Sequence, residues 1–299
     1  MALDDRWVTE ACAEAGSAFS LKIRDKLHEE QTAYQTIAVY ETEHFGTALF
    51  IDGFVQLTDR DNFIYHEMLV HPAMFTHPDP RSVLIVGGGD CGTLREVLKH
   101  PQVQSATQVE IDERVTRVAE THFPELCSAN RDIRATFRFT DGIRWVADSA
   151  ADQYDIILID STDPIGPAAG LFSEAFYRDC LRALRPGGIL AAQSESPLYH
   201  LPLILSMRSA MRCAGFSQTA TFNFPQCSYP SGWWSITLAA NNADLGHFRE
   251  DDVARRQFET NYYNAAIHRA SVASPEFMER ALRAEHADMV AVAAVGRSV

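Results

Sequence analysis

A glycine-rich segment carries the clearest chemistry in this sequence. Residues 87–92 read Gly-Gly-Gly-Asp-Cys-Gly and directly follow the apolar run 82–86. Glycines such as Gly87 and Gly89 let the backbone approach a ligand closely, and the helix expected after them offers free N–H groups. Glu110 lies about twenty residues further on, where a carboxylate can accept both hydroxyls of a ribose. The spacing therefore predicts a site for a ligand that contains a nucleoside.

Asp90 within this loop argues against a dinucleotide as the ligand. Its carboxylate would lie beside the pyrophosphate and repel it, whereas a positively charged ligand would be attracted. An ordinary tight turn that binds nothing is the simpler alternative, but it leaves the pairing of the loop with Glu110 unexplained.

Acidic or amide side chains follow five successive predicted strands. A single aspartate at such a position is most often a turn residue or a helix cap. Five strand ends in a row are harder to attribute to turns, and ligands of open parallel sheets bind outside the carboxyl ends of the strands. The residues are Asp90, Glu110, Asp141, Asp160 with Asp163, and Gln193 with Glu195.

Asp160 and Asp163 form the most informative pair. Asp160 comes directly after the apolar run 154–159, so a rigid strand positions it, and Asp163 follows within the same turn. Two carboxylates spaced in this way can face one cavity, where they can hold a diamine by charge-assisted hydrogen bonds or accept a proton from it.

The elements that must position these residues alternate between strand and helix. Strands are expected at 82–86, 106–111, 135–140, 154–159, 188–193 and 235–240, with helices between most of them. This alternation predicts an α/β fold with a doubly wound, mostly parallel sheet.

Shorter runs precede this region, at 36–41, 47–52 and 54–58, and Asp52-Gly53 is a strong hairpin signal. We therefore expect the chain to divide into three regions. They are an N-terminal antiparallel β domain (1–78), a Rossmann-like catalytic domain (79–240) and a largely helical C-terminal segment packed on it (241–299).

Composition narrows the possible partners. The formal net charge of −14 disfavours nucleic acids and anionic membranes. The six cysteines show neither a CxxC pair nor zinc-ligand spacing, so free thiols in a reducing compartment and no metal are expected. The N-terminus lacks the apolar core of a signal peptide, and no apolar run approaches the roughly 18 residues of a membrane span. We therefore expect a cytoplasmic protein.

Several longer strings resemble the polyamine aminopropyltransferases, the spermidine synthase family, from about Tyr34 to Leu282. The most specific strings are IDGFVQLTDRDNFIYHEM, VLIVGGGDCGTLREVLKHP, DIILIDSTDPIGPAAGLFSEAFY and NYYNAAIHRA. The resemblance implies the class I fold of S-adenosylmethionine-dependent transferases and a homodimer. It also implies transfer of an aminopropyl group from decarboxylated S-adenosylmethionine, a co-substrate rather than a bound cofactor, to putrescine.

The resemblance also implies roles for individual residues. Asp160 is the expected catalytic base, with Tyr65 relaying the proton. The expected donor-binding residues are Gln35, Gly87, Gly89, Asp90, Glu110, Asp141, Gly142 and Pro167. The expected amine-binding residues are His66, Asp90, Asp160, Asp163, Gln193 and Tyr229.

One departure concerns the glycine loop, where the family's usual GGGDGG is GGGDCG. A side chain makes positive φ costly, so we expect Cys91 to avoid it. The family's TERDEF is TDRDNF here, and Cys227 precedes the SYPSG string in the acceptor channel. The preferred amine therefore stays open among putrescine, cadaverine, a diaminopropane and spermidine.

Three alternatives share some features of this pattern. A polyamine N-methyltransferase would use the same fold and the same glutamate, although Asp90 should repel the carboxylate of ordinary S-adenosylmethionine. A non-catalytic nucleoside-binding protein would not need Asp160, Asp163 and Tyr65 together. A nicotinamide-dependent oxidoreductase is disfavoured by Asp90 and by the lack of a catalytic His or Lys pair at a strand end.

Overall fold

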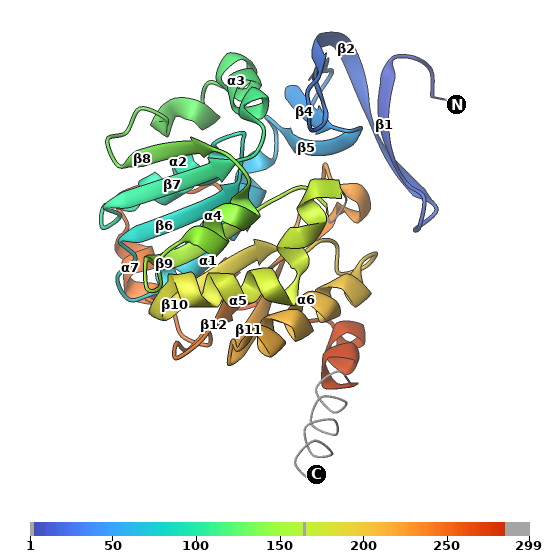
Figure 1. The fold of residues 1–299 in the computed structure, drawn as a ribbon. Coiled ribbons are helices and arrows are strands. Elements are labelled where there is room, and N and C mark those ends of the chain that lie inside the picture. Colours follow the sequence, from blue (N-terminus) through green and yellow to red (C-terminus); the bar gives the residue numbers. More distant parts are fainter. Residues whose placement is uncertain (1–2, 164–165, 285–299) are drawn as a thin grey trace.

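The computed structural model describes residues 3–163 and 166–284 and contains two sheets (Figure 1). The first sheet is antiparallel throughout, in the order β1-β2-β3-β4-β5. Its strands are β1 (Trp7–Cys12), β2 (Ser17–Gln31), β3 (Thr36–Thr42), β4 (Thr47–Ile51) and β5 (Phe54–Thr58). The predicted hairpin is confirmed, because Asp52 and Gly53 both have positive φ angles between β4 and β5.

The second sheet has seven strands in the order β11-β12-β10-β9-β6-β7-β8. β6 to β10 are parallel, and β11 and β12 are antiparallel additions at one edge, so the expected doubly wound, mostly parallel sheet is confirmed. The strands are β6 (Ser82–Gly87), β7 (Ser105–Glu110), β8 (Ala135–Phe139), β9 (Tyr154–Asp160), β10 (Leu184–Gln193), β11 (Gln218–Pro225) and β12 (Trp233–Ala240).

Eight α-helices and three 3₁₀ helices have both ends within the described residues, and a further helical stretch covers residues 276–284. The α-helices are α1 (Asn62–Thr76), α2 (Gly92–Leu98), α3 (Glu113–His122), α4 (Gly142–Asp148), α5 (Glu174–Ala183), α6 (Leu201–Ala214), α7 (Glu250–Arg255) and α8 (Ala265–Ser271). The 3₁₀ helices are η1 (Leu126–Ala129), η2 (Gly166–Phe172) and η3 (Pro230–Gly232). None of the helices in these described residues is long and apolar enough to cross a membrane.

Alternate residues of the central strands pack against helices on opposite faces. In β6, Val83 and Ile85 join the core beneath α1 and α2, whereas Leu84 and Val86 join the core beneath α4, α5 and α6. Figure 1 shows these two helical layers on either side of the sheet. Burial on both faces explains why the central strands are continuous apolar runs.

A third apolar cluster joins the two sheets. Ile37, Val39 and Leu49 of the N-terminal sheet pack in it with Val115 and Val118 of α3. Arg114 of α3 also pairs with Glu30 of β2 at 3.0 Å. These contacts hold the N-terminal sheet beside the carboxyl end of the central sheet.

The sequence prediction missed three strands. β1 and β2 escaped because the second half of β2 is charged and half-exposed, which hides the strand alternation. β11 escaped because this edge strand carries polar residues on one side and ends in a proline. The strand expected at 188–193 begins earlier, because β10 starts at Leu184 and shows a register shift between Leu184 and Ile189.

The described part of the segment after β12, residues 241–284, contains α7, α8 and a helical stretch at 276–284, and loops separate them. Residues 285–299 of the expected helical segment lie outside the described residues. The predicted N-terminal domain, residues 1–78, also includes α1, which packs against α2 and the central strands.

A buried carboxylate attaches this last segment to α1. Glu67 is 1% exposed, and its side chain accepts hydrogen bonds from the backbone N–H groups of Asn261, Tyr262 and Tyr263 at 2.7–2.9 Å. A buried charge satisfied by three donors stabilises the segment, and a change of one oxygen to an amide leaves donors facing each other.

Replacement of Glu67 by glutamine should therefore destabilise the fold by about 2–4 kcal/mol, measured as the free energy of urea unfolding. Glu113→Gln serves as the control, because that exposed carboxylate only pairs with Arg117 at 2.8 Å, and its loss should change stability little. Equal stability of the two variants would show that the three hydrogen bonds are not a major tie.

Candidate active site

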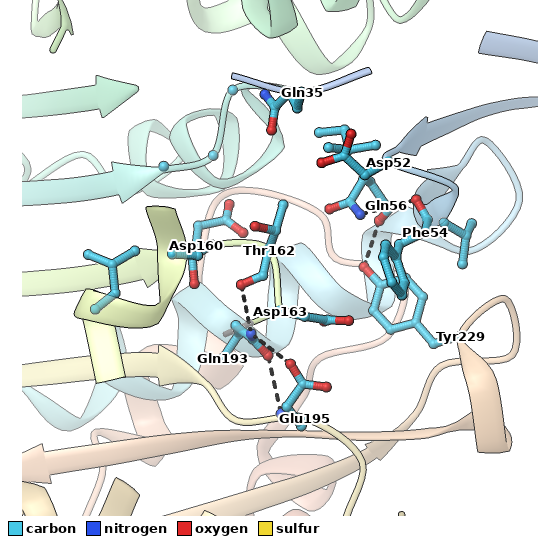
Figure 2. A pocket seen from close by; sticks show the side chains of 18 of the residues that line it. Gln35, Asp52, Phe54, Gln56, Asp160, Thr162, Asp163, Gln193, Glu195 and Tyr229 are labelled. Carbon is cyan, nitrogen blue, oxygen red and sulfur yellow. Dashed lines mark hydrogen bonds between the residues drawn. The ribbon is translucent and has the colours of Figure 1, made fainter. Parts of the chain in front are cut away.

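A cavity of about 780 Å³ lies outside the carboxyl ends of β6, β7, β9 and β10, and the N-terminal sheet closes its other side. Figure 2 shows Asp160, Asp163, Gln193 and Glu195 projecting into it from the central sheet and its loops. Gln35, Asp52 and Gln56 approach from the N-terminal sheet. All seven strand-end residues singled out from the sequence line this cavity.

The glycine loop packs tightly under the cavity. Gly87 and Gly88 have positive φ angles, and a Cβ added to Gly87 would lie 2.0 Å from the carbonyl oxygen of Asp160. A Cβ on Gly89 would lie 2.7 Å from Val115 and 3.0 Å from the Glu110 carboxylate. These close approaches explain why the loop needs glycine at these positions. Without side chains, the loop backbone can lie directly beside Glu110.

Cys91 corrects a prediction. We expected it to avoid positive φ, but its φ is +71°, in the left-handed region. Its backbone N–H donates to the carbonyl of Gly88 at 2.8 Å and closes the turn into α2. The tight turn requires this conformation, and the local geometry outweighs the steric preference of the side chain.

Glu110 and Gln35 lie at one end of the cavity. The Glu110 carboxylate accepts from the backbone N–H of Asp112 at 2.9 Å, and the Gln35 amide donates to the Asp112 carboxylate at 3.1 Å. Burial, together with the neighbouring acids, raises the pKa of Glu110 to about 7. A pair of ligand hydroxyls would give this buried carboxylate the donors it lacks.

Asp141 caps α4, and Gly142 begins that helix. The Asp141 Oδ1 atom accepts from the backbone N–H of Ile143 at 2.8 Å, and Oδ2 lies 3.9 Å from Nε of the exposed Arg144. A Cβ on Gly142 would lie 2.5 Å from Val86, so a side chain there would be crowded out. Pro167 falls in η2, but its side chain is outside what the structure describes, as are Pro164 and Ile165.

Asp160 lies at the centre of the cavity with both oxygens held. Tyr65 donates its hydroxyl hydrogen to Oδ1 at 2.7 Å, and Thr93 donates to Oδ2 at 2.6 Å. Burial and the nearby Asp90 raise the pKa of Asp160 to about 6. The pKa of the Tyr65 hydroxyl is raised well above its usual value by burial and by Asp160, so it stays a donor. Asp160 is therefore a fixed carboxylate poised to accept a proton near neutral pH.

His66 lies behind the cavity rather than along its wall. Its Nε2 is 3.1 Å from Asp90 Oδ1, and the backbone N–H of Gly92 donates to the same oxygen at 2.7 Å. Burial acts to lower the pKa of His66, but Asp90 outweighs it and the pKa is raised. The pair keeps Asp90 ionised in the cavity, so His66 touches Asp90 where the sequence suggested contact with the amine.

A second anionic group occupies the other end of the cavity. Burial and Glu195 raise the pKa of Asp163 to about 8, and burial raises that of Glu10 to about 7, with Glu195 adding to the shift. Gln193 donates to Glu195 at 3.1 Å and to the carbonyl of Thr162 at 3.5 Å. The half-buried His200 contacts this cluster, with its Nδ1 atom 3.2 Å from Glu195 Oε2, and Glu195 raises the pKa of His200. Glu10 and Asp163 keep their raised pKa values beside this pair, so a ligand ammonium group would be attracted to this end of the cavity.

Tyr229 faces this cluster and the N-terminal sheet. Its hydroxyl donates to the carbonyl of Gln56 at 2.6 Å (Figure 2). Its ring lies 6.0 Å from that of Tyr65. Tyr65 and Tyr229 therefore form an aromatic part of the cavity wall.

Sequence reasoning missed two contributors. Glu10 was missed because β1 was not predicted, although its carboxylate accepts from the backbone N–H of Val55 at 2.7 Å and bridges to β5. Thr93 was not singled out from the sequence, yet its hydroxyl donates to Asp160. The alternation of β1 and the position of Thr93 after the glycine loop were the only available signals. Among the described residues, no group of three or more acids, histidines or cysteines has the arrangement of a metal site.

Comparisons with known proteins identify the family. Residues 62–248 match the spermine/spermidine synthase domain, and residues 6–59 match the spermidine synthase tetramerisation domain. The chain is 59% identical to the polyamine aminopropyltransferase of Thioalkalivibrio sulfidiphilus over 94% of this chain and 99% of that one. It is 60% identical to the polyamine aminopropyltransferase of Methylococcus capsulatus over 93% of this chain and 97% of that one.

Solved structures agree with this result. A spermidine synthase in complex with the transition state analogue AdoDATO superposes with a TM-score of 0.90 at 34% identity, covering 94% of this chain and 96% of that one. The spermidine synthase of Thermotoga maritima gives a TM-score of 0.88 at 35% identity, covering 92% and 94%. The chain therefore belongs to the spermine/spermidine synthase family and is an aminopropyltransferase.

Proposed function

We propose that this enzyme transfers the aminopropyl group of decarboxylated S-adenosylmethionine to putrescine and releases spermidine and 5'-methylthioadenosine. The main observation that supports this proposal is the position of Asp160. It is a buried carboxylate between a nucleoside-binding end and a second anionic end of one cavity. A donor at one end and an amine at the other would meet beside it.

The donor fits the end formed by the glycine loop, Glu110 and Asp141. Glu110 would accept the ribose hydroxyls, and Oδ2 of Asp141 would accept from the adenine amino group, with Gln35 and Gly142 beside them. The sulfonium and the terminal ammonium of the donor are cationic, so Asp90 would attract them. The carboxylate of ordinary S-adenosylmethionine would instead meet Asp90 as a like charge. The site therefore gives no support to the N-methyltransferase alternative. The relatives are named polyamine aminopropyltransferases, so their names do not support it either.

The acceptor fits the passage from Asp160 to Asp163, Glu195 and Glu10. One amine would lie at Asp160 and attack, and the other would be a charged anchor at the far group of acids. The ammonium group at this end would offset the burial and the repulsion between acids that raise the pKa values of Asp163 and Glu10. A diamine therefore gains affinity from both ends, whereas a monoamine gains it from one.

The reaction needs a neutral amine in line with the donor carbon. An alkylammonium of pKa about 10.4 costs about 4.6 kcal/mol to deprotonate at pH 7. Asp160 would accept that proton as the amine nitrogen forms a bond to the aminopropyl carbon and the carbon–sulfur bond breaks. Tyr65 donates to Asp160 and fixes its orientation. Alignment of the two substrates could contribute roughly 7–11 kcal/mol more.

Several broader expectations stay predictions. The match to a tetramerisation domain supports an oligomer, and a homodimer is one form of it. All six cysteines lie in described residues and are free, which agrees with a cytoplasmic location. The division of the chain at residues 78 and 240 also stays a prediction.

Replacement of Asp160 by asparagine should lower kcat by roughly 10²- to 10⁴-fold, since the amide cannot accept the proton. The release of methylthioadenosine at saturating substrates measures this effect. Asp79→Asn, which removes an exposed carboxylate paired with Arg81 at 2.6 Å, should leave kcat unchanged. A fully active Asp160→Asn enzyme would exclude Asp160 as the base.

The wild-type kcat/KM for the donor should fall as the pH drops through about 6, where Asp160 becomes protonated. The raised pKa puts the loss on the acid side of neutrality, and the residual activity of Asp160→Asn should lack this inflection. A wild-type profile that stays flat from pH 7 to pH 5 would contradict the assignment.

Putrescine binding in the presence of methylthioadenosine should release protons at pH 7.5, because a dication lowers the raised pKa values of Glu10 and Asp163. Calorimetry in buffers of different ionisation enthalpy measures the number released. Glu10→Gln should reduce the release and raise the KM of putrescine about tenfold or more, with little effect on 1-aminobutane, which lacks the second ammonium. A matching loss for both amines would remove Glu10 from the anchor.

A further inference from the structure

Cys91 occupies an unusual position in the glycine loop. It has a left-handed backbone at φ +71°, its side chain is fully buried, and it lies between Asp90 and the first residue of α2. A side chain in this conformation carries a steric cost that glycine would avoid. The backbone geometry at this position therefore favours glycine and does not account for the presence of a cysteine.

A second thiol bonds to the same loop. The Cys91 Sγ is 3.6 Å from the carbonyl oxygen of Gly89, and the Cys127 Sγ is 3.8 Å from that of Asp90, the next residue along the loop. The Cys127 side chain is also the first cause of the raised pKa of Cys91, ahead of burial, which agrees with two thiols that bond to consecutive carbonyl groups of one turn. η1, which carries Cys127, packs against α2.

The two thiols differ in their access to solvent. Cys91 is buried, whereas Cys127 is partly exposed. An external reagent would thus reach Cys127 first, and Cys91 is the thiol placed to act on the product. This arrangement of one reachable thiol and one adjacent resolving thiol is what disulfide exchange requires.

We propose that Cys91 and Cys127 form a modification site, at which a low-molecular-weight disulfide converts the two thiols into an intramolecular disulfide that reversibly inhibits the enzyme. In the first step the Cys127 thiolate attacks the small disulfide and releases one small thiol. In the second step the Cys91 thiol attacks the Cys127 sulfur, its proton passes to the departing small thiolate, and this second small molecule leaves as a thiol. Two protein thiols are oxidised, and one small disulfide is reduced to two thiols.

The bond would distort the loop because it is short. A disulfide holds two sulfur atoms at about 2.05 Å, well inside the distance of two thiols in contact. The loop and η1 must therefore draw together. The loop places Gly89 against Glu110 and holds Asp90 on His66, so the shift would displace surfaces at which we propose that donor and amine bind. A misplacement of about 1 Å can reduce turnover by about 100-fold.

The test treats the full-length enzyme with oxidised glutathione, blocks free thiols by alkylation, and measures intact mass, the cross-linked peptide and aminopropyltransferase activity. We expect a peptide that joins Cys91 to Cys127, a loss of two hydrogen masses, and a fall in activity of about tenfold or more that dithiothreitol reverses. Cys127→Ser should form no such cross-link and should resist inhibition. Cys213→Ser, which removes an exposed free thiol, should respond as wild type does.

Three results would overturn the proposal. They are the absence of the cross-link under oxidation, its formation without loss of activity, and equal inhibition of the Cys127→Ser enzyme. Cys91→Gly adds a second arm, because it restores the unsubstituted loop residue and should abolish both the cross-link and the difference between oxidised and reduced enzyme. The inhibition rests on the proposed function, but the mass measurement does not, so a failure of one can be told from a failure of the other.

Discussion

Burial of like charges is the constraint on which this cavity depends. Asp160, Glu110, Asp163 and Glu10 are withdrawn from water, and burial is the first cause of the raised pKa of each. A folded protein tolerates such groups only if the rest of the structure holds them in place. The free enzyme therefore stores unfavourable electrostatic energy, which cationic ligands relieve. Affinity for polycations and readiness to accept a proton then have one physical origin.

The two sheets divide the work of holding these groups. The central sheet fixes Asp160 and Glu110 at the ends of strands that are buried on both faces, so neither carboxylate can retreat into solvent. The N-terminal sheet supplies Glu10 and Gln35 from the opposite side, and the apolar cluster with α3 keeps it close. A cavity between two separate sheets can be narrow along its length and still admit a ligand from its end.

The sequence predicted what short-range pattern encodes. Apolar runs identified the central strands, and polar residues at their ends identified the edge where a ligand binds, because both features repeat along the chain. Glu10 could not be found in this way, since it reaches the cavity only through the curvature that brings β1 near β5. The pairing of His66 with Asp90 depends on the packing of α1 against the glycine loop, and a linear pattern does not contain that contact. The prediction that Cys91 avoids positive φ was wrong for a similar reason, because the geometry of the turn outweighed the steric preference of the side chain.

Three consecutive residues of α1 serve three different regions of the molecule. Tyr65 bonds to Asp160, His66 pairs with Asp90, and Glu67 holds the backbone of residues 261–263. Successive side chains of an α-helix point about 100° apart, so these three side chains leave the helix in three different directions. Insertion or deletion of a single residue just before Tyr65 would rotate all three side chains away from their partners at once. The angular setting of this helix thus acts as a common reference for the base, the anion beside it and the C-terminal chain.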